Sequence, residues 1–225
     1  MSMNKMSYKL HPWHGLELGE KSPDQVSCYI EMVPTDNVKY ELDKKSGILR
    51  VDRPQQYSSY CPSLYGLLPR TYCGKRVGKY CGDKIGVPEI QGDADPLDIC
   101  VLAEKAIVRG DIIVQAIPIG GLRLIDGEQA DDKIIAVLAG DYLYGDLRDI
   151  KECSCNMLDR LRHYFLTYKD HPGEEGERQI QITHVYGREE AHEVIRLSAL
   201  DYEESTSEVL GHCFDSVVGS TDDTC

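Results

Sequence analysis

The stretch Gly92-Asp93-Ala94-Asp95-Pro96-Leu97-Asp98-Ile99-Cys100 places three carboxylates within six residues, directly ahead of an apolar, strand-like run. So many negative charges stay close together only when water or cations neutralise them. In an extended chain Asp93 and Asp95 point to one face and Asp98 to the other. Pro96 lacks an N–H and commonly marks a bulge or turn, which can bring Asp98 back toward its partners. Three convergent carboxylates predict a site for a hard cation, Mg²⁺ or Mn²⁺.

Two other interpretations of this stretch are a solvated surface loop and a helix-loop-helix calcium site. Short acidic clusters on loops are usually solvated surface. The calcium loop fits the acids at its first and third positions and Glu104 at its twelfth. It fails at Leu97 and at Asp98, where that loop needs a glycine, and the flanking sequence is typical of strands.

The composition excludes several classes of protein. The 225 residues are enough for one sizeable domain with a core. Lys and Arg total 25 against 38 Asp and Glu, and the formal net charge of −13 argues against a nucleic-acid surface. The longest purely apolar run, residues 134–139, is too short to span a bilayer, and the N-terminal residues lack the apolar region of a signal peptide. A cytoplasmic protein is therefore expected, with no membrane partner.

The cysteines indicate neither a disulfide framework nor a zinc ribbon. There are nine of them, scattered and without a CxxC pair. Cys153 and Cys155 flank one residue, and Cys73 and Cys81 bracket a loop rich in Gly and Lys. Reduced thiols are the expected state, with a metal or redox role for either pair as the lesser alternative.

The expected order of elements is strands first and helices afterwards. Residues 1–25 predict an irregular N-terminal arm, and residues 54–92 predict a long loop. The pattern elsewhere predicts two groups of elements. Strands are expected at 28–33, 38–42, 48–53, 100–108, 112–125, 133–139 and 179–187, and helices at about 154–169 and 188–204. The fold class is α+β and mainly β, as a small barrel or curled sheet, and residues 205–225 predict a disordered tail.

With these elements in place, the sequence resembles the family I soluble inorganic pyrophosphatases. The stretch from Asp93 to Ile99 resembles the signature of that family, with Ala94 as a mild departure. Further matches follow in the right order along the chain. They are Glu31 in CYIEM, Lys39 and Glu41 in VKYEL, Val51-Asp52-Arg53, Tyr65-Gly66, Asp126 with Asp131 and Lys133, and Tyr168-Lys169. The resemblance covers roughly residues 26–200.

The resemblance implies a five-stranded barrel of the oligonucleotide-binding type with flanking helices, formed by residues 26–204. It also implies hydrolysis of pyrophosphate to two phosphates and a site in the barrel cleft that holds several Mg²⁺ ions. The implied metal ligands are Asp93, Asp95, Asp98, Asp126 and Asp131, with Glu31 and Glu41 reaching the metals directly or through water. The implied phosphate ligands are Lys39, Arg53, Tyr65, Lys133, Tyr168 and Lys169, of which Lys39, Arg53 and Tyr65 also count as catalytic.

This distribution of residues suits the chemistry. Pyrophosphate has no apolar surface that a protein could bind, so cationic and hydroxyl donors must hold its oxygens. Metals neutralise the charge that grows on the leaving phosphate and acidify the attacking water. Asp95, central in the acidic stretch, is the expected general base for direct in-line attack, as the resemblance also implies.

Three departures from the family pattern affect the expectations. Cys61 occupies a position where many members carry a tyrosine, and Gly127 one where many carry an acid. About 18 or more extra residues lie between Tyr65 and Asp93, and this insertion, about residues 70–91, is expected to cover the cleft or to form a subunit contact.

Two other functions remain open at this stage. The cleft could accept a larger diphosphate such as a nucleotide, given Tyr57, Tyr60 and Tyr72 in the long loop. A barrel of this type could instead bind single-stranded nucleic acid, which the net negative charge opposes. The resemblance also implies a homo-oligomer of undetermined size.

Overall fold

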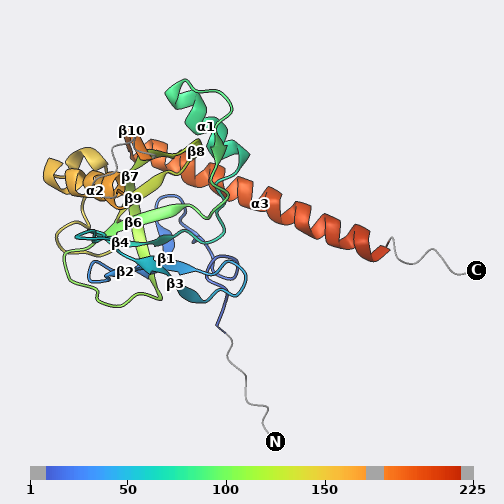
Figure 1. The fold of residues 1–225 in the computed structure, drawn as a ribbon, viewed down its shortest axis with the longest axis horizontal. Coiled ribbons are helices and arrows are strands. Elements are labelled where there is room, and N and C mark those ends of the chain that lie inside the picture. Colours follow the sequence, from blue (N-terminus) through green and yellow to red (C-terminus); the bar gives the residue numbers. More distant parts are fainter. Residues whose placement is uncertain (1–8, 171–179, 219–225) are drawn as a thin grey trace, which may run out of the picture.

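Five strands form a closed ring of backbone hydrogen bonds (Figure 1). The computed structural model describes residues 9–170 and 180–218, and their side chains except those of residues 208–218. Around the ring the strands follow the order β1, β4, β6, β9 and β7, and β7 pairs again with β1. Every pairing in the ring is antiparallel except that of β6 with β9. Their bounds are β1 Val26–Met32, β4 Leu64–Leu67, β6 Asp98–Leu102, β7 Ile112–Asp126 and β9 Lys133–Leu138.

The remaining elements attach to this ring. The β2–β3 hairpin forms a separate two-stranded sheet, β10 pairs antiparallel with the long strand β7, and the short strands β5 and β8 pair in parallel. Their bounds are β2 Val38–Leu42, β3 Leu49–Pro54, β5 Gln91–Gly92, β8 Gln129–Ala130 and β10 Ile180–Gly187. The helices are α1 Lys75–Ile85, α2 Cys155–Thr167, α3 Arg188–Val218 and the short 3₁₀ turn η1 Ile150–Glu152.

The central strands are apolar on both faces because each face is covered. Along β6, Ile99 and Val101 join a cluster that includes Ala191, Val194 and Ile195 of α3. The alternate residues Cys100 and Leu102 join a second cluster with Leu161, Tyr164 and Phe165 of α2. The period of two along the strand thus divides the core between two helices. The predicted α+β class, mainly β, is confirmed.

The long loop predicted for residues 54–92 is wrong at residues 64–67, which form β4, and at residues 75–85, which form α1. The buried face of α1 is made of Val77, Gly78, Cys81 and Gly82, so it lacks the bulky apolar repeat by which a helix is recognised. The glycines are needed because a Cβ on Gly78 would lie 2.5 Å from the carbonyl oxygen of Ile90. Close packing against the following loop therefore conceals the helix in the sequence.

The second predicted helix continues farther than expected. Its predicted end was Glu204, whereas α3 runs to Val218 and leaves the body of the molecule (Figure 1). None of the helices in the described ranges combines the length and apolar character needed to cross a bilayer.

Candidate active site

The acidic stretch forms a tight loop between β5 and β6. Asp95 donates its backbone N–H to Oδ1 of Asp93 at 3.0 Å, and Ala94 adopts a positive φ of 63° between them. The backbone of Cys73 binds the loop from outside, donating to the Asp95 carbonyl at 2.8 Å and accepting from the Ala94 N–H at 3.1 Å. Leu97 is fully buried and anchors the far end. The insertion therefore supports the acidic loop directly.

Lys133 joins two of the predicted metal ligands. Its ammonium forms ion pairs with Asp98 and with Asp131, because the parallel register places Asp98 of β6 beside Lys133 of β9. The Tyr65 hydroxyl donates to the same oxygen of Asp98 at 2.5 Å. Three neighbouring strands and the turn that precedes β9 thus bring a cation, two carboxylates and a phenol to one point.

Burial strongly affects the acids of this cluster. It raises the pKa of Asp93, with Asp131 as the next cause, and it raises the pKa of Asp131. Burial, followed by the charge of Asp98, raises the pKa of Glu31 to about 8. Burial would lower the pKa of Lys133, but Asp131 and Asp98 outweigh it and the pKa rises. A neighbouring cation therefore favours the charged form of these carboxylates.

Glu31 has a second contact that links the hairpin to the ring. Its carboxylate accepts the backbone N–H of Leu42 at 2.7 Å. Glu41, the other predicted glutamate, forms an ion pair with Arg50 at 3.4 Å. The structure therefore ties these two acids to the hairpin more closely than to the Asp98–Asp131 cluster.

Three of the predicted phosphate ligands, Arg53, Tyr168 and Lys169, form a second group at the end of α2. Arg53 lies over the Tyr168 ring at 5.7 Å and Lys169 over the same ring at 5.5 Å. Lys169 also donates to Asp126 at 2.5 Å. Within the described residues, Nη2 of Arg53 is buried and has no hydrogen-bond partner. A buried donor without a partner suits an anionic ligand.

Two residues that the sequence did not single out as ligands belong to this arrangement. Asp52 forms an ion pair with Arg53 and lies 3.5 Å from the Lys39 ammonium. Lys44, in the turn of the hairpin, forms an ion pair with Asp95. The place of Asp52 next to Arg53 was a usable signal, whereas nothing in the sequence connects Lys44 with a loop about 50 residues away.

The structure shows the surroundings of the three features that depart from the family pattern, which are Cys61, Gly127 and the insertion. Cys61 is buried, with its sulfur 3.9 Å from the Ser63 hydroxyl. Gly127 has a φ of 62° in the turn after β7, a backbone conformation that favours glycine. The insertion packs behind the acidic loop, with β5 paired to β8.

The donor set suits a hard cation. In the part of the chain that the structure describes, no three acids, histidines or cysteines already surround a common point, because lysines lie between the carboxylates. All the same, these acids are oxygen donors with raised pKa values. A divalent cation would neutralise their negative charge. These residues fit Mg²⁺.

Comparison with known proteins gives consistent results. The family model described as inorganic pyrophosphatase matches residues 28–203. The inorganic pyrophosphatase of Chlamydia caviae is 54% identical over 196 residues, covering 86% of this chain and 91% of that protein. The soluble inorganic pyrophosphatase of Oryza sativa subsp. indica is 37% identical over 174 residues, covering 77% and 72%. The crystal structure of the inorganic pyrophosphatase from Thermus thermophilus superposes with a TM-score of 0.71 at 26% identity, covering 86% of this chain and 99% of that one.

Proposed function

The chain belongs to the family I inorganic pyrophosphatases and hydrolyses inorganic pyrophosphate, and we propose that the two groups of residues around Lys133 and Tyr168 carry out this reaction with Mg²⁺. The observation that carries the proposal is the convergence of Asp98, Asp131, Lys133 and Tyr65 at neighbouring strands. Carboxylates for a cation and donors for a phosphate thus lie at one place.

The acids of the two segments 93–98 and 126–131 would hold the metal. The proposed ligands are Asp93, Asp95, Asp98, Asp126 and Asp131, with Glu31 and Glu41 direct or through water. When bound, Mg²⁺ lowers the pKa of water and offsets the charge of the leaving phosphate. Partial burial raises the pKa values of Asp93 and Asp131, and this supports the assignment because a bound cation favours their ionised form.

The cationic and hydroxyl side chains would hold pyrophosphate. The proposed ligands are Lys39, Arg53, Tyr65, Lys133, Tyr168 and Lys169. The free Nη2 of Arg53 can donate to one phosphoryl oxygen, and the ring of Tyr168 keeps the guanidinium in place. Asp52 forms ion pairs with both Arg53 and Lys39 and would orient them.

Asp95 would act as the general base. Its side chain is 38% exposed, so water and substrate can reach it. A carboxylate oxygen of Asp95 accepts a proton from the attacking water, and the nucleophile then displaces phosphate in line. Lys44 contacts this carboxylate and holds it at the mouth of the site.

The ring of strands supports a more specific assignment of the fold. Its order, its single parallel pair and its closure from β7 to β1 fit the five-stranded barrel of the oligonucleotide-binding type. We further infer an arm at residues 1–25, a catalytic domain at 26–204 with the insertion at about 70–91, and a tail at 205–225. A cytoplasmic homo-oligomer without nucleic-acid or membrane partners is part of the same proposal.

The experiment is phosphate release from pyrophosphate, with and without Mg²⁺, for the wild type and for Asp95→Asn. The variant keeps the shape of the side chain but removes the base, so turnover should fall roughly 10²–10⁴-fold. The exposed Asp146→Asn serves as a control and should retain the wild-type rate. A near wild-type rate in Asp95→Asn would remove Asp95 from the mechanism.

A further inference from the structure

A buried ion pair lies directly behind the strand end that carries Asp131 and Lys133. Arg123 and Asp132 are each 1% exposed, and Nη2 of Arg123 lies 3.3 Å from Oδ2 of Asp132. The antiparallel register pairs Leu122 with Lys133, which places Arg123 opposite Asp132. Since side chains alternate along a strand, Asp132 points away from the face shared by Asp131 and Lys133.

Groups from two further elements complete this network. The Tyr186 hydroxyl donates to Asp132 at 2.9 Å, and Nη1 of Arg123 donates to Glu190 at 2.7 Å. Tyr186 belongs to β10 and Glu190 to α3. The pair is thus held from the side opposite the active site.

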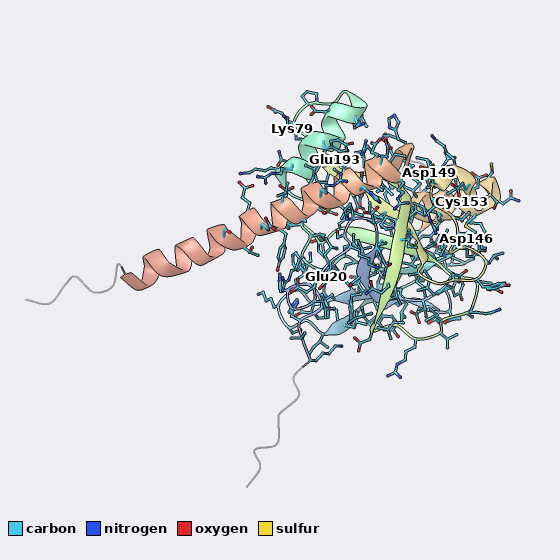
Figure 2. All side chains as sticks on the ribbon, turned by 180° about the vertical axis from the view of Figure 1, so that it is seen from behind. Glu20, Lys79, Asp146, Asp149, Cys153 and Glu193 are labelled. Carbon is cyan, nitrogen blue, oxygen red and sulfur yellow. The ribbon has the colours of Figure 1, made fainter. Side chains whose placement is uncertain are left out.

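The insertion covers the pair. The Arg123 guanidinium lies between two rings, 5.4 Å from that of Tyr80 on α1 and 5.0 Å from that of Tyr186. Lys84 of α1 also reaches Glu190 at 3.5 Å. Figure 2 shows Lys79 on α1 and Glu193 on α3, the two helices that meet over this region. The insertion therefore contacts the pair on one side and the acidic loop on the other.

Stability alone gives a weak reason for such a pair. Taking two charges out of water costs about as much as their attraction returns, and apolar replacements are often neutral or stabilising. Here Nε of Arg123 and Oδ1 of Asp132 are buried with no hydrogen-bond partner among the described residues, which adds to the cost. What the pair does provide is a fixed position for residue 132, and hence for its neighbours.

We propose that Arg123 is a positioning residue for pyrophosphate hydrolysis, which together with Asp132 and Tyr80 of the insertion holds Asp131 and Lys133 in place for Mg²⁺ and phosphate. The proposal rests on the assignment of Asp131 as a metal ligand. Replacing residues that orient metal ligands typically lowers metal affinity or activity by roughly 10–100-fold.

The first test replaces the pair by apolar residues in the double variant Arg123→Met, Asp132→Leu. Mg²⁺ binding is measured by calorimetry in the absence of substrate, beside the Mg²⁺ concentration for half-maximal activity and the thermal unfolding midpoint. We expect Mg²⁺ affinity to fall about tenfold while the midpoint is unchanged or higher. A lower midpoint with unchanged Mg²⁺ affinity would reduce the pair to a structural element and overturn the proposal.

The second test concerns Tyr80, a partly buried residue of α1 that packs against the first core cluster. Tyr80→Ala should weaken Mg²⁺ affinity about two- to fivefold, and Tyr80→Phe, which keeps the ring, should restore it. Lys79→Ala, on the exposed side of the same helix, is the matched control and should behave as wild type. Equal Mg²⁺ affinities in Tyr80→Ala and Lys79→Ala would contradict the role of the insertion.

Asp131→Asn separates this proposal from the one on which it rests. If Asp131→Asn leaves Mg²⁺ affinity unchanged, the assignment of the metal ligand fails. If it lowers the affinity while the Arg123 and Tyr80 variants do not, only the positioning role fails.

Discussion

Single residues in the site are arranged as mixed groups of cations and anions. Lys133 lies between Asp98 and Asp131, and Asp52 lies between Lys39 and Arg53. Lys133 lets the two neighbouring carboxylates approach each other, and Asp52 lets the two neighbouring cations do so. Each central residue therefore determines the geometry of its neighbours as well as the local charge.

Asp52→Ala tests this relation on the phosphate side. Without the carboxylate, Lys39 and Arg53 repel each other and lose a common orientation, so we expect KM for pyrophosphate to rise about tenfold. Steady-state kinetics at saturating Mg²⁺ measure the change, with Asp146→Ala as the exposed control. An unchanged KM would show that the two cations are oriented by Tyr168 and the backbone alone.

At the scale of elements, some parts of the fold could be predicted from the sequence and others could not. The strands around the acidic stretch and the amphipathic α2 carry clear periods of two and 3.6. The helix α1 could not be predicted, because two of its four buried residues are glycines and its N-terminal N–H groups are bound by Asp201, more than 120 residues away. A separation of 51 residues likewise conceals the contact of Lys44 with Asp95.

Gly78→Ala tests how closely α1 must pack. The added Cβ would lie 2.5 Å from the Ile90 carbonyl oxygen and 2.7 Å from the Gly92 nitrogen, both of them backbone atoms. We expect the free energy of unfolding to fall by about 1–3 kcal/mol, despite the higher helix propensity of alanine. Urea denaturation measures the free energy of unfolding. Lys79→Ala is the control for the effect of helix propensity alone. A stabilised Gly78→Ala variant would mean that α1 can shift without cost.

Asp149 joins the beginnings of two elements (Figure 2). Its carboxylate accepts the backbone N–H groups of Lys151 in η1 and of Arg188 in α3, both at 3.0 Å. Asp149→Ala should therefore lower the free energy of unfolding by about 1 kcal/mol at pH 7. Asp146→Ala, nearby and exposed, is the control for loss of charge.

The Asp149 effect should depend on pH in a defined direction. Burial raises the pKa of Asp149, but the hydrogen bonds from Arg188 and Lys151 outweigh it and lower the pKa. A group with a lowered pKa stabilises the folded state above its unfolded pKa and loses this effect as the pH falls through the folded value. The difference between wild type and variant should thus be constant above about pH 4 and shrink below it. A constant difference down to pH 2 would assign the effect to packing.

For the whole molecule, the net charge of −13 and the concentration of acids at one site predict a strong effect of divalent cations on stability. A ligand that binds only the folded state adds about 2.7 kcal/mol at 100 times its Kd. Thermal unfolding with Mg²⁺ should therefore give a higher midpoint than unfolding with chelator and NaCl of equal ionic strength. Asp131→Asn should show a smaller increase; an equal increase in this variant would place the stabilising ion elsewhere.

Closure of the ring also has a consequence for folding of the protein during its synthesis on the ribosome. Val26 of β1 pairs with Ala116 of β7, which is synthesised about 90 residues later. At about 5–20 residues per second, β1 waits roughly 5–20 s for this partner, with only β4 available on its other edge. During that interval one edge of an apolar strand is open to other nascent chains, so slower translation should increase aggregation rather than aid folding.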